Sequence, residues 1–416
     1  MIRRYGRSIG VLIVSNLLGG IGVASGFAVG GLLAQNLGGT SMAGLAQAAS
    51  TLGAAIAAVP LANVAARRGR RVSLSRGYAL ATVGALLIVT AAVTSQIVVM
   101  LLGMSLFGVA QAVNLQTRYA GAENVLPARR ARAMSIVLWA TTVGAVTGPN
   151  FAGPGDTFGA GFGLPRYTGP FLFSVVAFAS AATVIAVLFR PSIVHTQEAA
   201  DAAKSVDATP PAGARGALRW AAGDPVALFA VVLIATAHAV MVMVMVMTPV
   251  HMGNQGDTLQ LVGIVISLHV LGMYALSPVF GSMTDRLGSI PVAMVGIALL
   301  ATALGTGYSA ATGGTGLTMI ALTVLGLGWS AAVISASALV TARAPDHVRV
   351  GLQGATDAGM NYAGAAAAAA AGPILATGGF EALNITAALI LLPATLLLVR
   401  ALASEKKQHT AARSLI

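Results

Sequence analysis

The chain has 416 residues, of which 56% are hydrophobic and 9% are charged. A soluble protein of this length carries about a quarter of its residues as charged side chains, because water must solvate its surface. The 24 Lys and Arg and 12 Asp and Glu residues cannot cover such a surface. The composition therefore excludes a soluble protein and predicts an all-α protein that crosses a lipid bilayer several times.

The excess of basic residues does not indicate a nucleic-acid-binding protein. The formal net charge is +12 at pH 7, but Lys and Arg occur in short clusters between apolar stretches. The chain contains no cysteine, which excludes disulfides, thiolate metal sites and thiol redox chemistry. It also has no G-x-x-x-x-G-K-[ST] motif and no catalytic arrangement of Ser, His and Asp. We therefore expect no ATP, no cofactor and no enzymatic activity.

Twelve apolar stretches follow one another, and each can cross the membrane as a helix of roughly 20 residues. The first stretch lies behind Arg3, Arg4 and Arg7 and is too long for a signal peptide, so we expect a retained span. The predicted spans are 9–34, 41–66, 72–95, 97–126, 133–151, 168–189, 224–249, 260–283, 290–310, 315–341, 350–376 and 380–402.

One polar stretch interrupts this rhythm. Residues 190–223 are rich in Ala, Pro and charged residues, a composition typical of a linker. The linker divides the chain into six spans on each side, as expected for two repeated halves. We predict two six-helix bundles, residues 1–189 and 224–402, with a cytoplasmic linker between them and a cytoplasmic tail at 403–416.

The basic residues predict the orientation. If the N-terminus is cytoplasmic, all but two Lys and Arg residues fall on the cytoplasmic side, the exceptions being Arg166 outside and Arg118 within a span. We therefore expect both termini in the cytoplasm and a multi-pass protein of the cytoplasmic (inner) membrane.

A short turn occurs at the same place in both halves. After the second span of the C-terminal half the sequence is Gly281-Ser-Met-Thr-Asp285-Arg286-Leu-Gly288, and the N-terminal counterpart runs from Ala62 through Arg67 to Gly69. Glycine permits a sharp turn, and an Asp–Arg pair can latch neighbouring helix ends. We predict gating roles for Asp285, Arg286 and Arg67.

The repeated turn resembles the G-x-x-x-D-R-x-G-R-R turn of the major facilitator superfamily. The resemblance covers the whole chain and implies a secondary transporter whose two bundles surround a central cavity and alternate its access. The first turn departs from the motif at Ala62 and Ala66, and the second has Ser289-Ile290 in place of the basic pair.

The seventh and eighth spans contain unusual methionine and histidine residues. Met241 and Met245 are four residues apart, as are His269 and Met273, so each pair shares a helix face. Counting from the helix ends places both pairs near the middle of the membrane. Thioether and imidazole ligands suit Cu(I) better than Mg²⁺ or Ca²⁺. His251 and Met252 are candidates to collect the ion at the outer mouth.

These methionine and histidine residues also fit roles that need no metal. Methionine fills irregular space in helix packing. His269 in a span indicates a transport pathway, but it could equally relay protons in a drug antiporter or bind an organic substrate. The M-x-x-x-M and H-x-x-x-M pairs resemble those of the CcoA-type copper importers, and this resemblance implies copper ligation by Met241, Met245, His269 and Met273. Members of that branch also use cysteines, which this chain lacks.

Arg118 lies within the fourth span and needs an acidic partner inside the protein. Glu123 and Asp357 are the candidates. The group could form a structural or gate-closing ion pair, or Glu123 or Asp357 could couple transport to protons.

The leading hypothesis is import of copper by alternating access, with the four Met and His residues as a midplane site in a monomeric carrier. The alternative is a proton-coupled carrier of a small organic molecule, either a drug exporter or a vitamin importer. A third possibility is a membrane receptor or assembly factor that holds a metal without transporting it.

Overall fold

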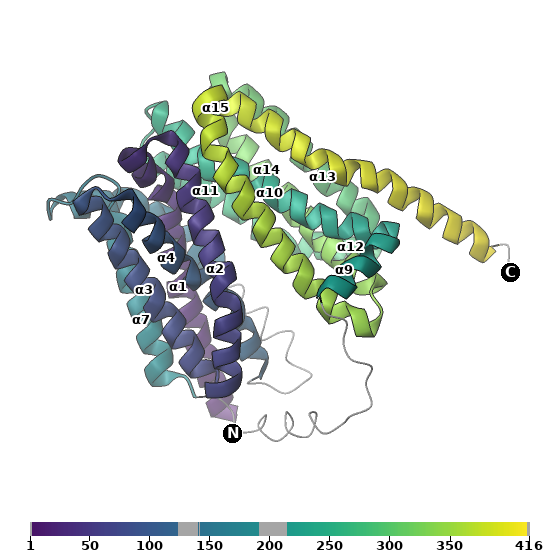
Figure 1. Ribbon diagram of the computed structural model, residues 1–416, viewed down its shortest axis with the longest axis horizontal. Helices are drawn as coiled ribbons and strands as arrows, with labels where there is room; N and C mark the ends of the chain where they lie inside the picture. Colours follow the sequence, from purple (N-terminus) through teal and green to yellow (C-terminus); the bar gives the residue numbers. More distant parts are fainter. Residues whose placement is uncertain (1, 124–139, 141, 191–213, 414–416) are drawn as a thin grey trace. The chain divides into compact units, whose positions relative to one another are not determined.

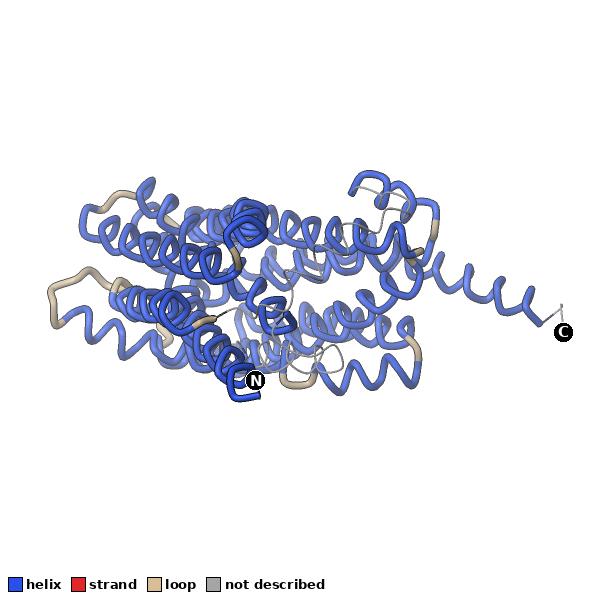
Figure 2. The backbone as a smooth tube through the Cα atoms, turned by 90° about the horizontal axis from the view of Figure 1, so that it is seen from below, coloured by secondary structure: helices blue, strands red, loops and turns tan. Residues whose placement is uncertain are grey.

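The computed structural model describes residues 2–123, 140, 142–190 and 214–413. Within these ranges the backbone forms helices and short turns and contains no strand (Figure 2). A helix satisfies its own backbone N–H and C=O groups, which hydrocarbon cannot do. Ten helices in the described part are long and apolar enough to cross a membrane. The chain is therefore an all-α membrane protein, as predicted.

The elements appear in chain order in Figure 1. They are α1 (Ile2–Gly38), α2 (Thr40–Arg68), α3 (Arg70–Thr94), α4 (Ile97–Glu123), the 3-10 helix η2 (Gly148–Phe151), α6 (Ala152–Ala160), α7 (Gly169–Leu188), α9 (Ala214–Gly223), α10 (Pro225–Asn254), α11 (Leu259–Tyr274), α12 (Ser277–Leu287), α13 (Ser289–Gly313), α14 (Thr315–Arg343) and α15 (Asp346–Arg413).

These helices account for the predicted spans. The eighth span is α11 and α12 together, and α15 contains the eleventh and twelfth spans, joined where Gly379 departs from helical geometry. Residues 133–139 and 141 of the predicted fifth span, 133–151, lie outside the described residues. The described part is helical from residue 142 and continues through η2 and α6 to Ala160. The described helices therefore follow the order of the predicted spans.

The chain forms two compact units. One comprises Met1–Val206 and Val246–Val270, and the other Asp207–Met245 and Leu271–Ile416. The boundary between the two units crosses α10 and α11. The end of α10 at Asn254 and the start of α11 at Leu259 pack against the N-terminal helices. Gly31 of α1 meets Val250, and Gly263 of α11 meets Pro149. The predicted bundle boundaries at 189 and 224 stay a prediction.

Glycine allows very close helix packing in the first unit, where α1, α3, α4 and α7 pack side by side (Figure 1). A Cβ on Gly53 of α2 would lie 1.8 Å from the Ser105 carbonyl oxygen of α4, and one on Gly108 would lie 1.8 Å from the Ser50 carbonyl oxygen. In α4, the buried ring of Phe107 packs 5.1 Å from that of Phe178. In lipid, apolar side chains gain little by leaving the solvent, so the helices associate through close backbone contact and aromatic packing instead.

Two glycine turns repeat in the two halves. Gly69 joins α2 to α3 with φ 83° and ψ 159°, and Gly288 joins α12 to α13 with φ 90° and ψ 160°. Both lie in the positive-φ region that favours glycine. The same backbone conformation therefore recurs at the turn that repeats in the sequence.

Candidate functional site

The predicted copper ligands fall in both units. Met241 and Met245 lie on α10, and Met241 is buried while Met245 is half-buried. His269 and Met273 are buried on α11. His269 belongs to the first unit, whereas the three methionines belong to the second. Convergence of the four residues on one ion therefore stays a prediction.

The other metal-related residues lie farther along α10. His251 and Met252 are both buried, near the Asn254 end of the helix. Among the described residues, no group of three or more His, Cys, Asp or Glu side chains is arranged to hold a metal ion. The ion-collecting role of His251 and Met252 stays a prediction.

The predicted gating side chains are solvent-facing. Asp285, Arg286 and Arg67 are exposed at the ends of α12 and α2. A neighbouring residue, Arg71, makes a contact that sequence reasoning missed: its guanidinium donates from Nε to the Ala186 carbonyl oxygen over 2.7 Å. Arg71 thus binds the last turn of α7, where a cation also interacts favourably with the helix dipole.

The predicted coupling residues are only partly described. The side chains of Arg118 and Glu123 lie outside the described residues, although their backbone belongs to α4. Asp357 is exposed on α15, and its carbonyl oxygen accepts a hydrogen bond of 2.8 Å from Asn361 Nδ2. Their pairing or coupling role stays a prediction.

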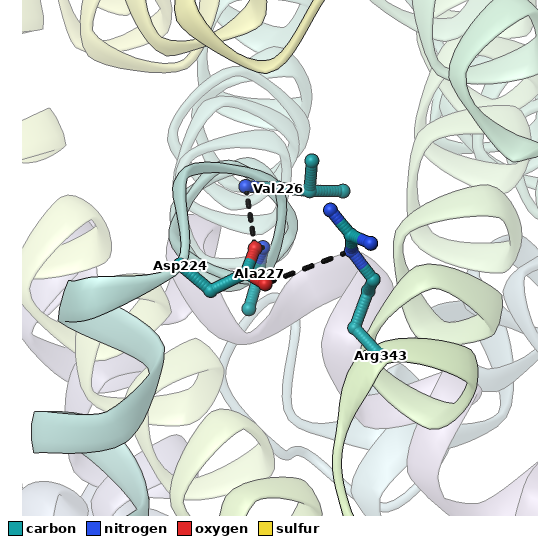
Figure 3. Close-up of polar contacts among 4 residues, drawn as sticks. All are labelled: Asp224, Val226, Ala227 and Arg343. Atoms are coloured by element: carbon teal, nitrogen blue, oxygen red, sulfur yellow. Dashed lines mark hydrogen bonds and ion pairs between the residues drawn. The ribbon is translucent and has the colours of Figure 1, made fainter. Parts of the chain in front are cut away.

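Sequence reasoning also missed an ion pair at one end of the second unit (Figure 3). Asp224 Oδ1 accepts hydrogen bonds of 2.9 Å from the backbone N–H groups of Val226 and Ala227, which caps the start of α10. Asp224 Oδ2 lies 3.7 Å from Arg343 Nε at the end of α14 (Figure 3). The pair therefore joins the start of α10 to the end of α14.

Three side chains in the second unit form what we call the aromatic cluster: His238 of α10, Tyr274 of α11 and Trp329 of α14. Trp329 Nε1 donates to His238 Nδ1 over 3.2 Å, and the two ring centroids are 6.2 Å apart. The ring of Tyr274 meets that of Trp329 edge to face, with centroids 6.0 Å apart. The arrangement combines π-faces with an imidazole, which suits recognition of an organic ring.

A glycine makes room for the imidazole. A Cβ on Gly364 of α15 would lie 2.8 Å from His238 Cδ2 and 3.0 Å from Nε2. The cluster is therefore bounded by four helices, α10, α11, α14 and α15. In the sequence, only the presence of a histidine in an apolar span pointed to this cluster. Its pairing with Trp329 and Tyr274 depends on how the helices are rotated about their axes.

The first unit contains a separate buried polar network. Tyr78 Oη lies 2.5 Å from Asn114 Oδ1, and Thr117 Oγ1 donates to Asn16 Oδ1 over 2.6 Å. A Cβ on Gly19 would lie 2.4 Å from Tyr78 Oη. Since these groups satisfy one another across α1, α3 and α4, they rigidify this unit.

Comparison with known proteins decides the family. The sequence model of the Major Facilitator Superfamily matches residues 11–260 and 230–415. The chain is 33% identical over 389 residues to an uncharacterized MFS-type transporter, YddS, of Bacillus subtilis, covering 93% of this chain and 88% of that protein. This chain belongs to the major facilitator superfamily.

Other transporters match over most of the chain. The riboflavin transporter RfnT of Brucella anthropi is 27% identical over 386 residues, covering 91% of each protein. Two solved structures share the fold: the human organic anion transporter MFSD10 (17% identity, TM-score 0.62, covering 95% of this chain and 99% of that one) and a bacterial metal transporter (14% identity, TM-score 0.67, covering 95% and 98%). The copper-importer branch stays a resemblance.

Proposed function

We propose that this superfamily transporter carries a small organic molecule rather than copper. The observation that carries the proposal is the 27% identity to a riboflavin transporter along 91% of both chains. The similarity extends over 91% of the chain and is not confined to one helix or turn. Riboflavin is therefore the first compound to test.

The side chains in the middle of the second unit support an organic cargo. The aromatic cluster provides ring faces and an imidazole. His238, Met241 and Met245 follow one face of α10, so the two methionines extend the cluster as an apolar wall. Flexible thioether side chains adapt to organic surfaces, which gives them a role that needs no metal.

The energy source is proposed to be an ion gradient. The chain has no Walker A motif, and Asp357 is an acidic residue on α15 that could couple transport to protons. The basic residues support a cytoplasmic-membrane location with both termini in the cytoplasm. We propose that the carrier works as a monomer.

Transport into proteoliposomes tests the proposal. Purified carrier is reconstituted, and uptake of radiolabelled riboflavin and of radioactive copper is measured in parallel, with and without a pH gradient. We expect saturable riboflavin transport that the pH gradient accelerates, and copper uptake no greater than in protein-free liposomes.

The opposite pattern would restore the copper hypothesis. Copper uptake that falls in both Met241→Leu and His269→Ala, together with no riboflavin transport, would contradict the organic-molecule proposal. Copper that binds but never accumulates would instead indicate the receptor or assembly factor.

A further inference from the structure

We propose that His238, Tyr274 and Trp329 form a mid-membrane binding site for a planar, uncharged heteroaromatic compound. The ring of the compound would stack against the aromatic side chains, and the His238 imidazole would donate a hydrogen bond to a carbonyl or ring nitrogen. The inference rests on the proposed function, since it names the substrate class and the site within the carrier.

The hydrogen bond to Trp329 determines which nitrogen of His238 carries the proton. The indole N–H can only donate, so His238 Nδ1 must be the acceptor of the 3.2 Å bond. The neutral imidazole then carries its proton on Nε2. Among the described residues, Nε2 makes no hydrogen bond, and His238 is only half-buried. The cluster therefore presents an N–H donor, His238 Nε2, whose direction is fixed by the bond to Trp329 and which is not used in a hydrogen bond among the described residues.

The cluster lies at the depth where carriers bind their substrates. Trp329 is midway between Thr315 and Arg343, the ends of α14, and His238 is close to the middle of α10. Substrate sites of secondary transporters lie near the bilayer midplane, where spanning helices are interrupted. The position of the cluster along its helices therefore agrees with a binding role.

The helix that carries Tyr274 is itself interrupted at this level. Helix α11 ends at Tyr274 and α12 begins at Ser277. Pro278 has no N–H for the Tyr274 carbonyl, which leaves this carbonyl as an acceptor at the break. Ser277 Oγ lies 3.3 Å from Ser330 Oγ, beside Trp329, so the break is fastened to α14 at the cluster. The break in the helix therefore lies next to the aromatic cluster.

The rings keep accessible surface for a ligand. Tyr274 is 40% exposed, and Trp329 is half-buried. The edge-to-face contact between them, at an interplanar angle of 75°, leaves the face of one ring unstacked. A planar compound can cover that face, because offset and edge contacts of aromatic rings are favourable at centroid separations of about 4.5–7 Å.

A polar helix face leads to the cluster. Asp357, Asn361 and Gly364 follow one face of α15 at four- and three-residue spacing. Exposure falls along this face from Asp357, which is exposed, through Asn361 to Gly364, which is buried against His238. Exposure along this face of α15 therefore decreases toward the imidazole. The nearest acidic residue on this face is two turns from His238, which favours an uncharged ring at the cluster.

Fluorescence of Trp329 provides a direct binding test. The chain has three tryptophans; replacing Trp139 and Trp220 with Phe leaves Trp329 as the reporter. Riboflavin is titrated into this variant in detergent. We expect saturable quenching, because a flavin stacked on the cluster accepts excitation energy from the indole. In the same background, His238→Ala and Tyr274→Ala are expected to weaken riboflavin binding at least tenfold.

Matched variants separate the site from general structure. Tyr308→Ala removes a tyrosine of similar exposure on α13, outside the cluster, and Thr236→Ala alters α10 away from the imidazole contact. Both are expected to bind riboflavin as the parent does. His238→Gln keeps an N–H donor and is expected to recover part of the affinity, which a purely structural role of the imidazole does not predict. Gly364→Ala is expected to weaken binding by displacing the imidazole.

The outcomes also distinguish this inference from the proposed function. Non-saturable quenching, or equal affinity in the parent, His238→Ala and Tyr274→Ala, would overturn the site. If riboflavin transport in proteoliposomes also persists in those two variants, the carrier function stands and only the site is wrong. Saturable binding that both variants lose, without any transport, would support the site and contradict the carrier function.

Discussion

Ser267 Oγ donates to the Val146 carbonyl oxygen over 2.7 Å, and Asn150 Nδ2 donates to Ser267 Oγ over 2.9 Å. These bonds join α11 to the 3-10 helix η2 within one unit. The 3-10 turn begins at Gly148 and Pro149 and interrupts the regular backbone bonding of the fifth span. Ser25 of α1 binds the same interruption through the Gly148 carbonyl oxygen at 3.1 Å. Side chains from two helices thus replace the missing helical donors.

Removing the Ser267 hydroxyl is expected to destabilise the protein. Ser267→Ala removes two hydrogen bonds, although Asn150 Nδ2 still donates to the Val146 carbonyl oxygen over 3.2 Å, so the expected cost is about 1 kcal/mol. Thermal unfolding in detergent should show a lower Tm. Ser309→Ala, which removes an exposed hydroxyl bonded only within its own helix, should leave Tm unchanged. Equal Tm values for both variants would contradict a structural role of the Ser267 bonds.

Close helix packing makes Gly53 sensitive to a single methyl group. Gly53→Ala places a Cβ 1.8 Å from the Ser105 carbonyl oxygen, and neither backbone can yield without separating α2 from α4. We expect a loss of about 3 kcal/mol or more. The matched variant Gly305→Ala meets no atom within 4 Å and should be neutral or stabilising, because Ala is the better helix former. Comparison of Tm values and of yield after detergent extraction tests whether Gly53→Ala destabilises the protein and whether Gly305→Ala does not.

The repeated turns require glycine for a backbone reason. Gly288 has φ +90°, where a residue with a Cβ is strained by roughly 1–2 kcal/mol. With ψ at 160°, this conformation lies outside the αL region that asparagine tolerates, so Gly288→Ala and Gly288→Asn should both lower Tm. Gly281→Ala, in open space on α12, is the control. If the Gly281 and Gly288 variants unfold at the same temperature, the turn does not depend on left-handed geometry.

Asp224 has two roles that substitutions can separate. Asp224→Ala removes the cap of α10 and the ion pair with Arg343, whereas Asp224→Asn retains a capping side chain. We expect loss of the cap to lower the free energy of unfolding by about 1 kcal/mol and loss of the partly exposed ion pair to lower it by less than about 1 kcal/mol. A double-mutant cycle with Arg343→Ala, followed by denaturant unfolding, measures the coupling. A larger effect of Asp224→Asn than of Asp224→Ala would contradict the capping role.

Composition and local sequence determined the membrane class, the helical fold and the repeated turns. The scarcity of charge requires lipid around the chain, and lipid requires helices, so the conclusion needs no tertiary information. Glycine at 69 and 288 likewise indicated turns, because its conformational freedom is a property of the residue itself. The family followed from the turn that repeats in the two halves.

Only the tertiary structure brought His238, Trp329 and Tyr274 together, although all three are visible in the sequence. Their spacing along the chain says nothing of the rotation of α10, α11 and α14 about their axes. A membrane helix with apolar residues on all sides has no marked polar face from which that rotation can be read. The 3-10 break at Gly148 was missed for a related reason, because the carbonyls it frees are satisfied by Ser25 and Ser267 from distant helices. Local chemistry decides that a segment enters the membrane, whereas packing against its neighbours decides which side chains meet there.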